Sequence, residues 1–85
     1  MKLEIGKCYK YLDELCKILS LSFEKDAVKI NFIRLSEDSI DVSDQIFMLT
    51  DLDRFTEINE EVFIDKGEIL IRTFNRGLYR NFKES

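Results

Sequence analysis

The chain has 85 residues, of which 45% are hydrophobic and 35% charged, and its formal net charge is −4. A chain of this length forms one domain, residues 1–85, and buries only about 60–65% of its unfolded surface, which argues against an enzyme with a deep, walled pocket. Histidine is absent, which removes the commonest general base and the Ser-His-Asp and Cys-His forms of catalysis. We therefore expect a non-enzymatic protein that acts through its surface.

The first twenty residues fit two structures. In one, a strand over 3–11 leads to a turn at 13–15, with an irregular or one-turn helix over 11–15, and to a second strand from Cys16. The alternation of the tyrosines and the early Gly6 favour this interpretation. In the other, an amphipathic helix begins near Lys7, because apolar residues recur at helical spacing. These residues are Cys8, Leu12, Leu15, Cys16 and Leu19.

Residues 17–35 predict an antiparallel hairpin. Leu19, Leu21 and Phe23 alternate along the first strand, and Val28, Ile30 and Phe32 alternate along the second. Pairing Phe23 with Val28 places Leu21 opposite Ile30 and Leu19 opposite Phe32. Both apolar rows then share one face of the sheet, as a hairpin with one buried face requires.

The next segment predicts a turn at 36–39, a short strand at 40–42 and another strand at 45–49. Thr50 or Asp51 can cap a short helix or 3₁₀ turn that follows. Leu52, Phe55 and Ile58 are three residues apart, which predicts that they share one side of that turn.

Residues 61–65 and 68–74 predict a brief strand and a closing strand, joined by a turn at Gly67. The stretch 74–83, FNRGLYRNFK, fits either a helix or a hairpin. In the helix, Arg72, Arg76 and Arg80 form a stripe opposite Phe74, Leu78 and Phe82. In the hairpin, residues 75–77 form a turn with Gly77 in the left-handed conformation. Gly6, Gly67 and Gly77 are each expected at turns that need a positive φ.

These elements predict a mostly β fold of five or six short strands with one short helical turn. A small barrel, for which an SH3-like arrangement is compatible with the order of the elements, is the expected architecture. The alternative is an α+β fold in which an N-terminal helix packs on an antiparallel sheet.

Two cysteines are too few for a disulfide framework, and without histidine they cannot form an ordinary four-ligand zinc site. We expect Cys8 and Cys16 to be small buried hydrophobic residues. Asp38, Asp41 and Asp44 lack the central glycine and terminal glutamate of a calcium loop. The sequence therefore predicts no metal, no cofactor and no catalytic residues.

The expected location is the cytoplasm, with reduced thiols and no membrane partner. No apolar run approaches the roughly 18 residues that span a bilayer, and charges interrupt the N-terminal residues where a signal peptide has its apolar core. Residue usage favours amino acids with AT-rich codons, which suggests a low-GC bacterium or a phage. Small acidic proteins of such genomes often act on host proteins.

Residues 36–65 carry ten acidic side chains against Arg54 alone. This acidic belt predicts a binding protein, an inhibitor or adaptor, that docks on a basic protein surface such as a nucleic-acid-binding groove. Solubility is the competing explanation. The candidate contacts are Glu37, Asp38, Asp41, Asp44, Asp51, Asp53, Glu57, Glu60 and Glu61.

Residues 66–85 carry five basic and two acidic side chains. An alternative function is an RNA- or single-strand-binding module, because basic residues beside an aromatic ring suit phosphate contacts and base stacking. A further alternative is that the basic tail pairs with the acidic belt, within one chain or across a homo-oligomer. The nucleic-acid candidates are Arg72, Arg76, Tyr79, Arg80 and Lys83.

Overall fold

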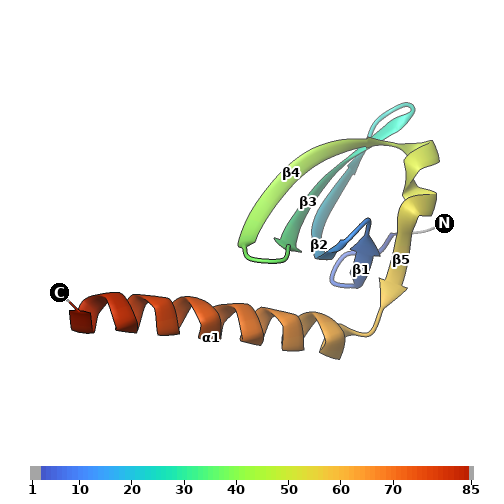
Figure 1. Ribbon diagram of the computed structural model, residues 1–85. Coiled ribbons are helices and arrows are strands. Elements are labelled where there is room, and N and C mark those ends of the chain that lie inside the picture. The colour runs from blue at the N-terminus through green and yellow to red at the C-terminus, as the bar shows by residue number, and fades with distance from the viewer. Residues whose placement is uncertain (1–2, 85) are drawn as a thin grey trace.

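The computed structural model describes the backbone of residues 3–84 and the side chains of residues 3–74. Five antiparallel strands form one sheet in the order β4-β3-β2-β1-β5 (Figure 1). The elements are β1 (Cys8–Tyr11), β2 (Glu14–Phe23), β3 (Ala27–Leu35), β4 (Ile40–Met48), the 3₁₀ helix η1 (Leu49–Arg54), β5 (Phe55–Ile58) and α1 (Glu60–Glu84).

The mostly β prediction is confirmed, but the sheet is not a closed barrel. β4 and β5 are its two edge strands, and η1 joins them across the open side of the curved sheet (Figure 1). The predicted N-terminal helix is wrong, because residues 8–11 and 14–23 are strands. An α+β description also fits, with its helix at the C-terminal end of the sequence.

Alternation along the strands gives the sheet two apolar faces. The inner face is covered by η1 and holds the larger core, which includes Tyr9, Ile18, Ile30, Phe47 and Phe55. The outer face is covered by the first half of α1 and holds a smaller core of Cys8, Leu35, Phe63 and Leu70. Because burial of apolar area is the main source of folding free energy, both η1 and α1 are needed to shield the sheet.

The hairpin of β2 and β3 follows the predicted register at its turn, where Phe23 pairs with Val28 and Leu21 with Ile30. Further along, a bulge between Ile18 and Ser20 shifts the register. Phe32 therefore pairs with Ile18, not with the predicted Leu19. Ile18 is fully buried and Leu19 is exposed, so the bulge exchanges which of the two neighbours enters the core.

The N-terminal strand interpretation is confirmed for Cys8–Tyr11, but residues 3–7 are not part of the strand and no helical turn follows it. β1 and β2 are joined by a two-residue turn at 12–13, with Tyr11 paired to Glu14. Gly6 has the expected positive φ of 87°. Its amide donates a hydrogen bond of 2.8 Å to the carbonyl oxygen of Ile18, which ties the chain before β1 to β2.

The two strands predicted at 40–42 and 45–49 are one continuous strand, β4. The helical turn after it is confirmed as η1, although neither Thr50 nor Asp51 caps it, because Met48 holds the capping position without a side-chain hydrogen bond. Leu52 and Phe55 belong to the inner core, whereas Ile58 packs in the outer one. The prediction that all three share one side is therefore wrong.

The strands predicted at 61–65 and 68–74 are wrong, because both segments belong to α1. Asn59 caps this helix: its side-chain oxygen accepts a hydrogen bond of 2.9 Å from the amide of Glu61. Glu60 and Glu61 then place negative charge at the positive end of the helix dipole. Gly67 and Gly77 lie inside the helix, so neither forms the predicted turn, and the helix interpretation of 74–83 holds for the backbone.

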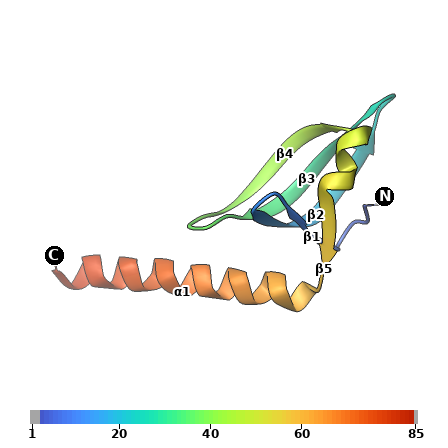
Figure 2. The same ribbon diagram turned by 45° about the vertical axis from the view of Figure 1, so that its right-hand side comes forward.

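Only part of α1 has a sheet beside it. Its first half runs along the outer face, and its second half projects past the β3–β4 turn in both views (Figures 1 and 2). Phe63, Gly67, Leu70 and Phe74 follow one another at helical spacing along one stripe. Phe63 and Leu70 are buried, whereas Phe74 is 40% exposed, which marks where the sheet ends along the stripe.

Candidate functional site

One end of the sheet collects negative charge from two turns that are distant in sequence. Leu15 pairs with Leu35 and Leu35 with Ile40, which brings the β1–β2 turn beside the β3–β4 turn. This end holds five carboxylates around Arg34, and all these charges sum to a formal charge of −4. We call it the acidic end; its carboxylates belong to Asp13, Glu14, Glu37, Asp38 and Asp41.

Arg34 organises the acidic end from β3. Its Nε and one terminal nitrogen donate hydrogen bonds of 3.1 and 2.8 Å to the two carboxylate oxygens of Asp41, and its Nε lies 3.4 Å from a carboxylate oxygen of Glu14. Hydrogen bonding by Arg34 lowers the pKa of Asp41, and the same contact raises the pKa of Arg34. The Ser43 hydroxyl donates a further bond of 3.0 Å to Asp41. Asp41 and Glu14 are thus held in place beside Arg34.

Leu12 stands at the tip of the β1–β2 turn, beside Asp13. Its φ is +54°, and the backbone conformation there costs a residue with a side chain about 1 kcal/mol relative to glycine or asparagine. The side chain is 62% exposed, so packing does not compensate for this cost. An exposed apolar side chain on a strained turn is a candidate for an anchor that meets a partner.

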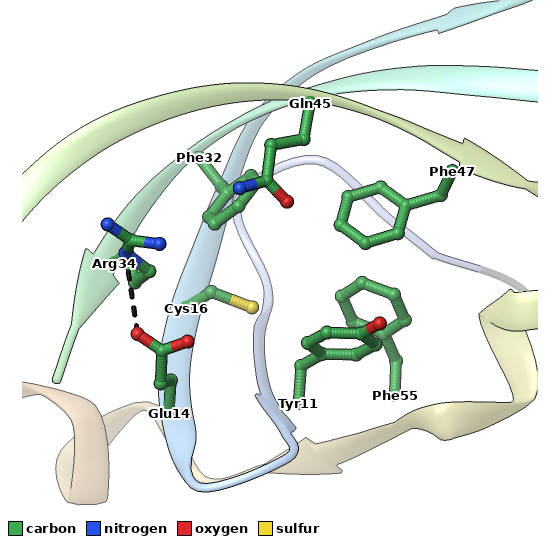
Figure 3. A pocket seen from close by; sticks show the side chains of 8 residues that line it. All are labelled: Tyr11, Glu14, Cys16, Phe32, Arg34, Gln45, Phe47 and Phe55. Atoms are coloured by element: carbon green, nitrogen blue, oxygen red, sulfur yellow. Dashed lines mark ion pairs between the residues drawn. The ribbon is translucent and has the colours of Figure 1, made fainter.

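A small pocket opens on the inner face next to the acidic end (Figure 3). Tyr11, Phe32, Phe47 and Phe55 supply its apolar walls, and Glu14, Arg34 and Gln45 line it together with Cys16. The rings also pack against one another, with centroids of Tyr11 and Phe47 5.4 Å apart. Its volume of about 40 Å³ is far below the several hundred cubic ångströms of an ordinary small-molecule site. It can accept an alkyl group, not a whole substrate.

The predicted acidic belt is distributed over several parts of the molecule. Asp41 lies at the acidic end with Glu37 and Asp38. Asp44 lies on β4, where it pairs with Lys29 at 3.4 Å. Asp51 and Asp53 lie in η1, at the opposite end of β4.

The last three belt residues lie where β5 meets α1. Glu57 pairs with Lys7 at 3.5 Å, and Glu60 pairs with Lys17 at 3.4 Å. Glu61 sits in the first turn of α1. Among the described side chains, Asp41, Asp44, Glu57 and Glu60 therefore already face a basic side chain of the same chain.

The basic candidates all fall on α1. Arg72 is exposed and pairs with Glu68, one turn earlier, at 3.7 Å. Arg76, Tyr79, Arg80 and Lys83 continue the helix, and their side chains lie outside the described residues. Arg72, the basic candidate whose side chain is described, thus pairs with an acid of its own helix.

Both cysteines are free and buried, as the sequence predicts. Burial raises the pKa of Cys16 to about 12, and it also raises the pKa of Cys8. Cys16 donates a weak hydrogen bond to the carbonyl oxygen of Tyr9. Among the described side chains, no group of three or more Cys, Asp or Glu is arranged to hold a metal ion.

Sequence reasoning missed Leu12, Asp13 and Glu14. The charge count placed the acidic region at 36–65, because Lys7, Lys10 and Lys17 make the first third slightly basic. The pairing of β2 with β3 brings these acids beside Glu37 and Asp38. A two-residue turn recognised at 12–13 would have indicated the strained leucine in advance.

Comparison of the chain with protein-family models, with curated proteins and with solved structures finds no match. Within the described part of the chain, no helix combines the length and the apolar content required to cross a membrane. The candidate site therefore has to be interpreted from its own geometry and chemistry.

Proposed function

We propose that the protein is a non-catalytic binding protein, an inhibitor or adaptor, that docks its acidic end on a basic surface of another protein. The observation that carries this proposal is the exposed, strained Leu12 at the tip of a surface with five carboxylates. A surface of a nucleic-acid-binding protein has the complementary charge.

The acidic end combines long-range attraction with a short-range apolar contact. Its carboxylates raise the rate of encounter with a positive surface, mostly through Glu37, Asp38 and Asp13, which are exposed. Leu12 then supplies apolar contact area, because it lies at the tip and is held there by the paired strands. The neighbouring aromatic pocket can receive the alkyl part of a lysine or arginine side chain.

A titration of the isotopically labelled protein with a synthetic lysine–leucine peptide tests the proposal. Amide resonances of the β1–β2 and β3–β4 turns should shift, and binding should weaken as salt is added. Glu37→Gln with Asp38→Asn should weaken binding several-fold. The matched control is Glu24→Gln with Asp26→Asn, which removes the same charge from the exposed β2–β3 turn at the other end of the sheet.

Equal weakening by both pairs of substitutions would show that only net charge matters, and would remove the acidic end as a docking surface. Binding that is unchanged by the first pair would do the same. A glutamate–leucine peptide should cause no shifts at either turn, since like charges repel.

Binding of RNA or a single strand is a second candidate function, supported by the helical backbone of residues 72–84. On a helix, Arg72, Arg76, Arg80 and Lys83 fall on one side, so that a phosphate backbone could contact them together. A gel-shift titration with short single strands at low and moderate salt tests this. No retardation at low salt rejects it, and retardation lost in Arg76→Gln with Arg80→Gln supports it.

A further inference from the structure

Two exposed apolar surfaces of the described residues resemble the two sides of the contact between α1 and the outer face of the sheet. Both consist of aliphatic or aromatic side chains. One is the part of the outer face of the sheet that α1 does not reach, where Val42 and Ile46 on β4 are 65% and 66% exposed and Met48 is also exposed. The other is the projecting half of α1, where Ile71 and Phe74 are exposed. We define these as the β4 patch (Val42, Ile46, Met48) and the α1 stripe (Ile71, Phe74).

Each surface continues a buried contact within the chain. On β4, Ile40 packs against the outer core, and Val42 and Ile46 follow it on the same face at alternate positions. On α1, Phe74 follows Phe63 and Leu70 along one stripe. Part of the outer face of the sheet is therefore not covered by a helix, and part of α1 is not packed on a sheet.

We propose that a second copy of this chain supplies the missing half of each surface. In a two-fold dimer, the projecting half of α1 from each copy lies over the β4 patch of the other. Such an interface is isologous, so both patches of both copies are covered at once and the buried area is twice that of a single contact.

Charge supports a second copy as the occupant. The sequence of α1 from Ile71 onward holds Arg72, Arg76, Arg80 and Lys83 against Glu84 alone. β4 and the turn before it hold Glu37, Asp38, Asp41 and Asp44, and no basic residue. Asp41 and Asp44 already pair with Arg34 and Lys29 of their own chain, so Glu37 and Asp38, both exposed, supply the negative charge for a partner. Docking α1 of one copy along β4 of the other brings these opposite charges together, which favours this pairing over two like surfaces.

Sedimentation velocity over a range of protein concentrations tests the dimer. The wild-type chain should change from monomer to dimer as concentration rises, and the dimer should weaken in high salt. Ile46→Thr and Phe74→Gln should each raise the dissociation constant at least about tenfold. Both positions are exposed in the single chain, and threonine suits a strand, so both variants should keep the wild-type circular dichroism spectrum.

The matched controls are exposed apolar residues away from both surfaces. Ile69→Gln removes a similar side chain from the other flank of α1, and Phe23→Thr removes one at the end of β2. Neither should change the dissociation constant. If the controls weaken the dimer as much as Ile46→Thr does, general hydrophobicity drives the association and the proposed interface is wrong.

Disulfide trapping tests the contact between copies directly. A mixture of Ile46→Cys and Phe74→Cys chains should give a disulfide-linked dimer in higher yield than either variant alone, because a two-fold interface brings residue 46 of one copy to residue 74 of the other. The native thiols of Cys8 and Cys16 are buried and should not compete.

A chain that stays monomeric at millimolar concentration overturns the proposal. If that monomer binds anionic vesicles or a different protein through Phe74, the α1 stripe has another occupant and the proposal is likewise wrong. The dimer would share Glu37 and Asp38 with the acidic end, but Ile46 and Phe74 lie outside it. A peptide titration of the Phe74→Gln variant therefore tests the docking function in a chain whose dimer contact is removed, so that the two proposals can fail separately.

Discussion

Arg34 and Asp41 pair directly across β3 and β4, and their side chains form two hydrogen bonds of 3.1 and 2.8 Å. They connect the last residues of β3 to the first residues of β4, on either side of the turn that carries Glu37 and Asp38. The pair therefore fixes the β3–β4 turn relative to the rest of the acidic end.

The Arg34–Asp41 contact should make stability depend on pH in the acidic range. The pKa of Asp41 is lowered from 3.8 in the folded protein, so its contribution is present above that value and is lost as the pH falls through the folded pKa. Asp41→Asn should lower the free energy of unfolding near neutral pH. The difference from wild type should vanish in strong acid, as measured by urea unfolding at a series of pH values. A difference that is constant with pH would contradict the assignment.

Leu12→Asn should stabilise the protein by about 1 kcal/mol, because asparagine tolerates the left-handed conformation that Leu12 adopts. It should at the same time weaken binding of a basic peptide, because the apolar side chain at the tip is lost. Leu12→Ala is the control: it loses the side chain but keeps the backbone cost, and so should not be stabilised. Urea unfolding and the peptide titration measure the two effects.

Leu70→Ala should destabilise the protein by about 2–5 kcal/mol, because it opens a cavity in the outer core between α1 and the sheet. Its neighbour Ile69 is 58% exposed, and Ile69→Ala should change stability by less than about 0.5 kcal/mol. Urea unfolding followed by circular dichroism distinguishes them. Equal effects would show that α1 is not docked through Leu70.

Gly67→Ala should stabilise the protein by about 0.5–1 kcal/mol. Gly67 lies inside α1, where alanine is a better helix former, and an added methyl group would meet Leu35 at an ordinary contact distance of 3.8 Å. Gly6→Ala should have the opposite sign, since φ at Gly6 is +87°. Thermal unfolding of both variants measures this, and two shifts of the same sign would contradict it.

Cys16 should make the protein sensitive to alkali. Burial raises its pKa from 9.0 to about 12, so the neutral thiol is favoured in the folded state and the thiolate in the unfolded state. Stability should therefore fall as the pH rises above 9.0, and Cys16→Val should reduce that fall. Urea unfolding at alkaline pH measures the slope. An identical slope in the variant would assign the alkaline loss to other groups.

The sequence alone determined most of the sheet. Alternating apolar residues in 17–35 predicted the β2–β3 hairpin and its register at Phe23 and Val28, because a strand with one buried face repeats every two residues. The same pattern failed at Leu19, where a bulge shifts the alternation by one. The position of a bulge depends on the curvature of the whole sheet, and the local sequence pattern does not predict this bulge.

Packing on the sheet, together with a local cap, decided the state of residues 60–74. Their valine, isoleucine and phenylalanine side chains suit a strand, and the closing-strand prediction followed from that local preference. They form a helix because Asn59 caps its start and because Phe63 and Leu70 can cover Leu35 on the outer face only at helical spacing. Local preference is weak, and burial against a sheet that already exists overrides it.

The position of the acidic end was likewise determined by the tertiary structure. The sequence revealed an excess of acids in 36–65, but charge counted along a chain ignores which strands become neighbours. Pairing of β5 brought Glu57 close to Lys7, and docking of α1 brought Glu60 close to Lys17. Pairing of β2 with β3 placed Asp13 and Glu14 beside Glu37 and Asp38. The sequence thus determined how much charge the protein carries, and the fold decided where that charge is concentrated, because Coulomb interactions depend on distance in space.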